Sequence, residues 1–236
     1  MHLFLSDNTT TPYVTLLPDD SRHCVRVLRM AVGDELWVTS GDGTMCRAII
    51  TDPDDKGCEV EVVERITNYQ PRPFHLHVAV APTKNNARLE WFVEKAVEIG
   101  IDRITPLICD HSERGSLRTD RLEKLAMSAM KQSLKATRPI IDQPVKMVDF
   151  LRQQGNADPS TQRFVCYCSG DDRHTLRQLY TPGTNALVLI GPEGDFSDRE
   201  ITTALQLGFQ PVTLGDSRLR TETAALYATT VLNFMN

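Results

Sequence analysis

Hydrophobic and polar positions alternate in short runs through the first third of the chain. The runs Glu35–Thr39, Thr44–Thr51 and Cys58–Ile66 are rich in residues that favour strands, and turn-forming residues separate them. This spacing predicts an antiparallel meander in a small sheet or barrel. Asp20–Met30 precedes the meander and predicts one short helix.

The pattern changes beyond Asn68–Pro73, a segment that carries two prolines and has no hydrophobic period. We therefore expect a β-domain over residues 1–70 and a second domain over residues 71–236. In the second part, strand-like and helix-like runs alternate, which predicts an α/β domain on a mainly parallel sheet. Its strands are expected at His75–Ala81, Arg103–Ile108, Phe164–Cys168, Ala186–Ile190 and Pro211–Leu214.

Longer helices are expected between these strands and after the last one. Ala87–Ile99 carries a regular apolar face and stops at Gly100, a residue suited to ending a helix. A second helix is expected from Asp120 to about Ala136. The last, Glu222–Met235, is apolar around much of its circumference, so we expect it to be buried.

The composition is that of a folded protein of a reducing compartment. Of 236 residues, 41% are hydrophobic, which suffices for a substantial core. No apolar run approaches the roughly 18–20 residues that span a bilayer, and no signal-peptide pattern is present, so we expect a cytoplasmic protein without membrane association. Six cysteines lie mostly in apolar runs, and strand alternation explains Cys166 and Cys168 better than a metal pair does. No cluster with ligand spacing predicts a metal.

The formal net charge of −5 argues against binding nucleic acid by bulk electrostatics. Any contact with RNA then needs a local basic face. Arg22, Arg26 and Arg29 are a candidate, because their spacing places three guanidinium groups on one side of the predicted N-terminal helix. A solvated helix surface is the alternative explanation.

The strongest local signal in the second domain is a strand, a glycine loop and a helix start in succession. Ala186–Ile190 runs into Gly191-Pro-Glu-Gly194, and Ser197 with Glu200 forms a capping-box pattern after it. Ligands in α/β sheets bind at the carboxyl ends of strands, where glycine lets backbone amides come close. The loop is thus a candidate cofactor cradle, although a tight strand-to-helix turn explains the same residues.

A second polar loop follows Pro211–Leu214 and leads from Gly215 into the last helix. If its strand neighbours Ala186–Ile190, the two loops face each other across one site. Arg220 and Glu222 lie at the entrance to the helix, where an ion pair or a cap is the alternative to a chemical role.

Together these motifs are similar to those of the SPOUT methyltransferases, in particular the bacterial family that methylates N3 of a uridine in 16S ribosomal RNA. The resemblance rests on Gly191-Pro-Glu-Gly194 and on Leu214-Gly215 with Leu219-Arg220-Thr221-Glu222-Thr223-Ala224. Further matches cover nearly the whole chain in the right order: Arg26-Val-Leu-Arg29 with Gly33-Asp34, Lys95-Ala-Val-Glu-Ile-Gly100 with Pro106-Leu107, and Ser112-Glu113-Arg114.

The resemblance implies a PUA-like N-terminal β-barrel domain and a C-terminal α/β domain that is threaded into a trefoil knot. It also implies a homodimer that acts on 16S rRNA within the small ribosomal subunit. S-adenosyl-L-methionine (AdoMet) would be the co-substrate, held by Gly191, Pro192, Glu193, Gly194, Leu214, Gly215, Leu219, Thr223 and Ala224. Arg22, Arg26 and Arg29 would then position the RNA.

The chemistry requires loss of a proton that uridine N3 keeps at neutral pH. Arg220 would stabilise negative charge on a uracil oxygen, and Glu222 would accept the proton or hold Arg220 in place. The sequence departs from the family pattern at Asp195, where many relatives have glycine, at Asp216-Ser-Arg218 and at Met130-Lys-Gln-Ser-Leu134. Three alternatives remain: a SPOUT methyltransferase for another RNA, a non-catalytic RNA-binding dimer, and a nucleotide-binding regulatory module.

Overall fold

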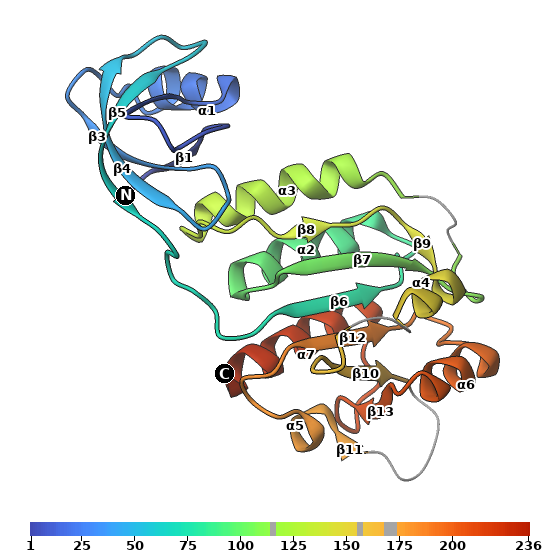
Figure 1. Cartoon of the computed structure of the whole chain (residues 1–236). Helices are drawn as coiled ribbons and strands as arrows, with labels where there is room; N and C mark the ends of the chain where they lie inside the picture. The colour runs from blue at the N-terminus through green and yellow to red at the C-terminus, as the bar shows by residue number, and fades with distance from the viewer. Residues whose placement is uncertain (114–116, 155–157, 168–173) are drawn as a thin grey trace. The chain divides into compact units, whose positions relative to one another are not determined.

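The computed structural model describes residues 1–113, 117–154, 158–167 and 174–236. These residues form two compact units (Figure 1). One unit comprises Met1–Pro71 together with Met130–Arg138, and the other comprises Arg72–Ala129 together with Pro139–Asn236. The first unit thus includes a segment that the sequence pattern assigned to the second domain. Arg114 and Cys168, named in the sequence analysis, lie outside the described residues.

The first unit is built on a five-stranded sheet in the order β1-β3-β4-β5-β2. Its strands are β1 (Leu3–Leu5), β2 (Tyr13–Thr15), β3 (Glu35–Thr39), β4 (Met45–Asp52) and β5 (Glu59–Ile66). β3, β4 and β5 pair in antiparallel fashion, which confirms the predicted meander, and β1 joins β3 in parallel. The pattern did not predict β1 and β2, because runs of three residues are too short to display alternation.

Residues Met130–Arg138 are held in the first unit by polar and apolar contacts. The hydroxyl of Thr39 donates a hydrogen bond to the carbonyl oxygen of Ala136, 3.2 Å away. Lys131 forms an ion pair with the buried carboxylate of Asp20. The helix that leads into this segment ends at Gln132, before the predicted end near Ala136, and Leu134 then adopts a left-handed φ of 55°.

The N-terminal helix is shorter than predicted and of mixed type. α1 (Pro18–Arg22) continues into a π-helical turn, η1 (His23–Val27), and Arg29 follows with a left-handed φ of 57°. A π-helical turn is wider than an α-helical one, so the spacing of the arginines no longer aligns them. The predicted continuous arginine face is therefore wrong at Arg29, although Arg22, Arg26 and Arg29 are all exposed.

The second unit is built on an eight-stranded sheet in the order β11-β13-β10-β12-β6-β7-β8, with β9 paired to β7. The central strands are β6 (Leu76–Val80), β7 (Arg103–Ile108), β10 (Gln162–Cys166), β12 (Ala186–Ile190) and β13 (Gln210–Thr213). Every pairing among them is parallel, which confirms the predicted sheet type. The short strands β8 (Ile140–Ile141), β9 (Val145–Lys146) and β11 (His174–Thr175) were not predicted.

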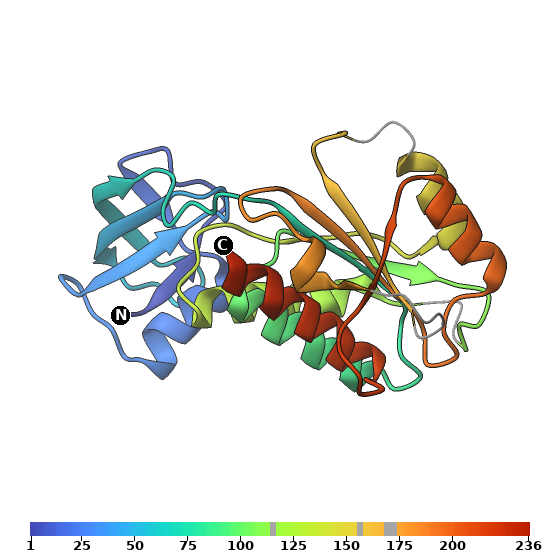
Figure 2. The ribbon, with the colours of Figure 1, turned by 90° about the horizontal axis from the view of Figure 1, so that it is seen from below.

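Helices flank this sheet, and α2 and α7 lie side by side (Figure 2). The helices are α2 (Asn86–Ile99), α3 (Thr119–Gln132), α4 (Met147–Gln154), α5 (Leu176–Leu179), α6 (Asp198–Gln206) and α7 (Thr221–Met235). α2 buries the predicted apolar face and ends at Gly100, whose φ is 134°. α7 is buried on one side only, because Tyr227 and Phe234 are 47% and 85% exposed. The prediction of a buried last helix is therefore wrong for its other side.

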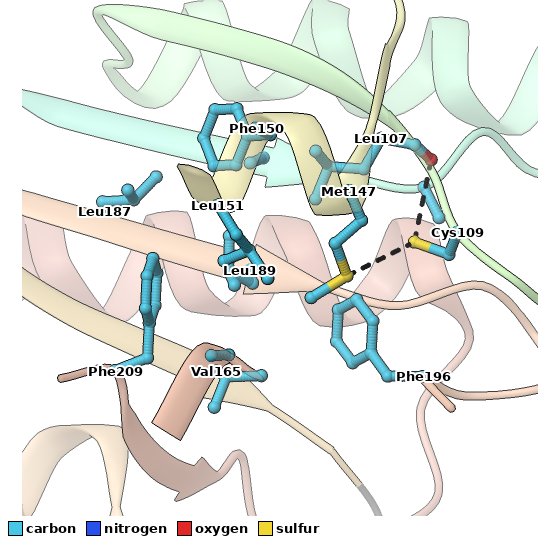
Figure 3. Packing of buried hydrophobic residues seen from close by; sticks show 13 residues of the cluster. Leu107, Cys109, Met147, Phe150, Leu151, Val165, Leu187, Leu189, Phe196 and Phe209 are labelled. Atoms are coloured by element: carbon cyan, nitrogen blue, oxygen red, sulfur yellow. Dashed lines mark hydrogen bonds between the residues drawn. The ribbon is translucent and has the colours of Figure 1, made fainter. Parts of the chain in front are cut away.

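The core beneath the candidate site joins α4 and α6 to the sheet. Met147 and Phe150 of α4 pack with Leu189 of β12 and with Phe196, which follows the glycine loop (Figure 3). Burying one such side chain contributes about 1.5–3 kcal/mol, so this cluster fixes the strand ends that carry the loops. None of the helices within the described ranges is long and apolar enough to cross a bilayer.

Candidate functional site

The glycine loop after β12 is a tight turn that is anchored at both ends. The backbone amide of Asp195 donates to the carbonyl oxygen of Pro192 at 3.0 Å, which closes the turn. Asp195 has a left-handed φ of 63°, a conformation that glycine adopts more readily than other residues. Its carboxylate accepts a hydrogen bond from the amide of Phe196 at 2.8 Å, and this local bond helps an aspartate to adopt the conformation.

His111, which lies just beyond the end of β7, contacts this loop through its imidazole ring. Its Nδ1 lies 3.2 Å from the carbonyl oxygen of Gly194 and 3.1 Å from that of Asp195. A Cβ atom placed on Gly194 would lie 3.2 Å from the Cβ of His111. The glycine therefore lets the two segments approach, and the histidine holds them together.

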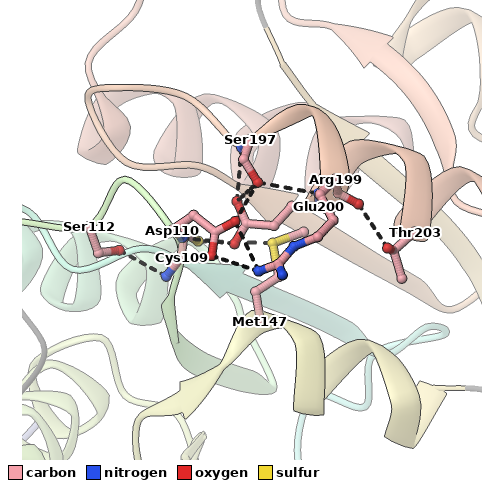
Figure 4. Close-up of polar contacts among 8 residues, drawn as sticks. All are labelled: Cys109, Asp110, Ser112, Met147, Ser197, Arg199, Glu200 and Thr203. Atoms are coloured by element: carbon pink, nitrogen blue, oxygen red, sulfur yellow. Dashed lines mark hydrogen bonds and ion pairs between the residues drawn. The ribbon is translucent and has the colours of Figure 1, made fainter.

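Asp110 connects the same end of β7 to the start of α6 (Figure 4). Its carboxylate accepts a hydrogen bond from the hydroxyl of Ser197 at 2.6 Å and pairs with Arg199 at 3.1 Å. The hydrogen bond from Ser197 and the charge of Arg199 lower the pKa of Asp110, so the carboxylate is ionised at neutral pH. The predicted capping box of Ser197 and Glu200 is present, and Glu200 also accepts from the amide of Asp110 at 2.9 Å.

A cavity of about 440 Å³ opens between the glycine loop and the loop after β13. Its volume lies in the usual range of ligand pockets, about 300–1,000 Å³. The sequence analysis took β12 and β13 to be neighbours. In the structure they are not, because β10 lies between them. The end of β10 therefore also contributes to the wall, through Cys166 and Tyr167.

Most residues that the resemblance assigns to the cofactor line this cavity: Gly191, Pro192, Glu193, Gly194, Leu214, Gly215, Leu219 and Ala224. Thr223 is exposed and does not line it, whereas its neighbour Thr221 does. The hydroxyl of Thr221 donates to the carbonyl oxygen of Gly191 at 3.0 Å, which ties the start of α7 to the glycine loop. Thr221 is a functional candidate that the sequence analysis missed, although it lies between two residues that it named.

Arg220 and Glu222 are placed differently from each other. Arg220 is exposed and occupies the N-cap position of α7, without a side-chain cap hydrogen bond. Glu222 is 7% exposed, and its Oε1 lies 3.7 Å from Nε of Arg88 on α2. No ion pair between Arg220 and Glu222 occurs among the described residues. The sequence pattern did not indicate a functional role for Arg88, because its partner Glu222 lies far away in the chain.

The cavity fits a ligand that needs close backbone approach. Two glycines and a proline form one wall, Gly215 with a φ of 121° begins the other, and apolar side chains such as Leu219 complete the lining. Of the charged residues in the lining, Glu193, Asp216 and Arg218 are exposed, whereas Asp195 is half-buried. Such a lining suits a ligand with an apolar ring and a few polar ends. Among the described residues, no group of three or more acidic, histidine or cysteine side chains is arranged to hold a metal ion.

The N-terminal arginines lie in the first unit with partners of their own. Arg22 pairs with Asp19 at 3.5 Å, and Nε of Arg26 donates to Asp55 at 2.7 Å. The hydrogen bond from Arg26 lowers the pKa of Asp55, so this carboxylate is ionised at neutral pH. These two ion pairs reduce the local positive charge. Of the three arginines, Arg29 is the one without an ion pair among the described residues.

Comparison with known proteins gives a consistent result. A family model described as an RNA methyltransferase domain matches residues 70–233, and another described as an RNA methyltransferase PUA domain matches residues 16–63. A ribosomal RNA small subunit methyltransferase E from Buchnera aphidicola is 28% identical over 240 residues, which cover 99% of this chain and 92% of that protein.

Solved structures are similar over the same extent. A crystal structure from Porphyromonas gingivalis, described as a probable rRNA-methyltransferase, is 39% identical with a TM-score of 0.91 and covers 100% of this chain and 98% of that one. A Legionella pneumophila structure in complex with the bound cofactor SAM is 27% identical with a TM-score of 0.85, covering 98% and 96% of the two chains.

Proposed function

Because this chain belongs to the RNA methyltransferase family, with a PUA domain before the catalytic domain, we propose that it transfers a methyl group from AdoMet to N3 of a uridine in 16S rRNA. The nucleotide would be the one that corresponds to U1498, on which the family acts. The observation that carries the proposal is the cavity between the two loops, in a chain whose family transfers methyl groups to RNA.

The residues that would hold AdoMet are those of the cavity wall, from Gly191 to Gly194 on one side and from Leu214 to Leu219 on the other. AdoMet supplies an electrophilic methyl group when bound there. His111 and Thr221 would keep the first loop in place, since both are hydrogen-bonded to its carbonyl oxygens. Orientation of this kind supplies a large part of the rate acceleration, up to about 7–11 kcal/mol in well-aligned cases.

Arg220 and Glu222 are the proposed catalytic residues. Arg220 is exposed at the start of α7, where its guanidinium can approach a uracil oxygen and stabilise the negative charge that develops on it. Glu222 would accept the N3 proton. The alternative that Glu222 holds Arg220 is not favoured, because its carboxylate faces Arg88 instead.

The first unit would position the RNA through Arg22, Arg26 and Arg29. RNA phosphates would have to displace Asp19 and Asp55 from the first two of these arginines. Contacts of this kind fix the register of the RNA but do not read its sequence. We further propose that the substrate is the assembled small subunit, in the cytoplasm, and that the C-terminal domain carries the trefoil knot of the family.

The exposed side of α7 supports a homodimer. Tyr227 and Phe234 are seven residues apart, so they lie on one face of the helix, and both are largely exposed. Exposed aromatic side chains on one face are typical of protein interfaces. Replacing both with glutamate should convert the dimer into a monomer in sedimentation experiments, whereas Val63→Glu, an exposed apolar position on β5, should not.

The direct test is incubation of the protein with labelled AdoMet and small ribosomal subunits that lack the modification. We expect label in 16S rRNA, at N3 of one uridine, by digestion and nucleoside analysis. Label in tRNA or 23S rRNA alone would favour a related enzyme for another RNA. Binding of RNA without any transfer would favour a non-catalytic dimer, and absence of AdoMet binding by calorimetry would favour the nucleotide-binding module.

A further inference from the structure

The carboxylate of Glu222 is buried without a full set of partners. The side chain is 9% exposed, and Oε2 has no hydrogen-bond partner among the described residues. Oε1 lies 3.7 Å from Nε of Arg88, which is longer than an N–H···O hydrogen bond of about 2.7–3.2 Å. The acid and the arginine therefore attract each other, but each keeps hydrogen-bonding capacity.

An incompletely paired buried carboxylate is costly, by several kcal/mol in real proteins. Glu222 lies in the first turn of α7, where the helix dipole favours an anion. Arg88 lies in the first turn of α2, where the same effect disfavours a cation, so local helix electrostatics alone do not explain it. A function at this position explains both features: the pair retains an acceptor and a donor for a third group.

The pair is adjacent to the proposed cofactor cavity. Thr221 and Ala224, on either side of Glu222 in sequence, line the cavity, and Thr221 is bonded to the glycine loop. Arg88 has 36% of its side chain exposed, so a substrate can approach the pair from that side.

Other charged groups around Glu222 are few. Of the strands that pack on α7, β12 has no titratable residue, and β6 has only His77, which is hydrogen-bonded to Thr105. α5 carries Arg177, but this helix meets the C-terminal end of α7, where Asn236 donates to Tyr180. Arg220 belongs to the start of α7 itself. On α2, which packs against α7, Lys95 pairs with Glu94 and Glu98 of its own helix. Arg88 is thus the cation of α2 that pairs with Glu222 in the described structure.

We propose that Arg88 is a positioning residue that acts through Glu222: its guanidinium holds the buried carboxylate in the orientation that takes the uridine proton. The inference rests on the proposed function. In the transfer step the N3–H bond breaks, and its proton goes to a carboxylate oxygen of Glu222. The electron pair on N3 forms the bond to the methyl group, while the electrons of the methyl–sulfur bond stay on sulfur. Glu222 then releases the proton to water.

The test is the single-turnover rate with saturating AdoMet and small ribosomal subunits, measured beside the affinities for both. Arg88→Met should lower this rate by about tenfold while both affinities stay nearly unchanged, because an orientation effect appears in the rate and not in binding. Arg88→Lys, which keeps a cation next to the carboxylate, should restore most of the rate.

The matched control is Arg121→Met, which removes an arginine that pairs with Glu90 of α2 at 2.7 Å, and it should leave the rate unchanged. In a Glu222→Gln background, Arg88→Met should have no further effect, because the two residues act as a unit. A loss of AdoMet or RNA affinity in place of rate, or an undiminished effect in the Glu222→Gln background, overturns the role of Arg88. If Arg88→Met misfolds, Arg88→Gln tests the same loss of rate. Absence of transfer by the wild-type protein overturns the proposed function and this inference together.

Discussion

Nδ1 of His111 lies 3.2 Å from the carbonyl oxygen of Gly194, so a residue beyond β7 holds the loop that follows β12. The contact is possible because Gly194 has no side chain, since an added Cβ would lie 3.2 Å from the Cβ of His111. The shape of the proposed cofactor pocket therefore depends on two segments that are 83 residues apart in sequence.

Gly194→Val should weaken AdoMet binding while leaving the protein folded. The branched side chain would push His111 away and move the backbone of the loop. Isothermal calorimetry measures the affinity, and circular dichroism checks the fold. Gly57→Val is the matched control, because its Cβ would be similarly close to a side chain, 3.3 Å from Thr15, but in the first unit. Unchanged AdoMet affinity in folded Gly194→Val would remove the loop from the pocket.

Asp195 should tolerate glycine but not valine. Glycine adopts the left-handed φ of 63° freely, and this gain offsets the absence of the bond to the amide of Phe196. A β-branched residue would destabilise the protein by about 1–2 kcal/mol, the cost of left-handed backbone. Urea denaturation of Asp195→Gly and Asp195→Val gives both values, and equal stability of the two variants would contradict the prediction.

Replacing Arg22, Arg26 and Arg29 with glutamine should weaken RNA binding and leave AdoMet affinity nearly unchanged. For each arginine that no longer neutralises a phosphate, the slope of log affinity against log salt should fall by about 0.7–0.9. Because Asp55 and Asp19 already occupy two of the arginines, we expect Arg29→Gln to have the largest single effect. Filter binding at several salt concentrations measures the slopes. A common loss of RNA and AdoMet binding would indicate misfolding instead.

Arg220→Ala and Glu222→Gln should lower the single-turnover methylation rate far more than the affinity for AdoMet or RNA. Interactions that form in the transition state appear in the rate and not in binding. The rate of Glu222→Gln should partly recover as pH rises, because the uridinate then forms without a proton acceptor. Normal rates at saturating AdoMet in both variants would show that these residues belong only to the scaffold.

His77 should make the folded protein less stable in acid. Burial, together with the charge of Arg103, lowers the pKa of His77 to about 3. As pH falls below about 6.5, the unfolded chain binds a proton that the folded protein does not, so stability declines by at most about 1.4 kcal/mol per pH unit down to the folded pKa. Since the His77 side chain is half-buried, the decline should cover a narrower pH range than full burial would give.

His77→Gln should remove this part of the pH dependence, because glutamine does not titrate. Urea denaturation between pH 7 and pH 4 compares it with the wild type and with His75→Gln, whose side chain is exposed. Parallel pH profiles for wild type and His77→Gln would show that the imidazole has the same pKa in the folded and unfolded states.

The hydrophobic pattern alone determined many elements of this protein. β3, β7 and β12 have the predicted bounds, and α2 buries the predicted face, because alternation and helical periodicity are local properties of the sequence. The hydrophobic pattern did not predict where two helical segments are interrupted, because the backbone dihedral angles of single residues determine those points. The helix expected to end near Ala136 stops at Gln132, and the arginine face breaks at Arg29, where left-handed residues interrupt each segment.

The glycine loop and the two residues at the entrance to α7 were also identified from sequence, because short motifs carry their own geometry. The order of the strands in the sheet was not predicted from sequence. The hydrophobic pattern of a strand indicates that the strand is buried, but it does not indicate which strand lies beside it. The insertion of β10 between β12 and β13 therefore came only from the structure, and with it the contribution of Tyr167 to the cavity.

Contacts between distant segments are the part that only tertiary structure decided. Met130–Arg138, which begins with the end of α3, joins the first unit, and Glu222 meets Arg88 rather than Arg220. Each of these contacts depends on two side chains that carry no signal about one another in a single sequence. The physical reason is that periodicity specifies which face of an element is buried, whereas packing of the whole chain specifies what covers that face.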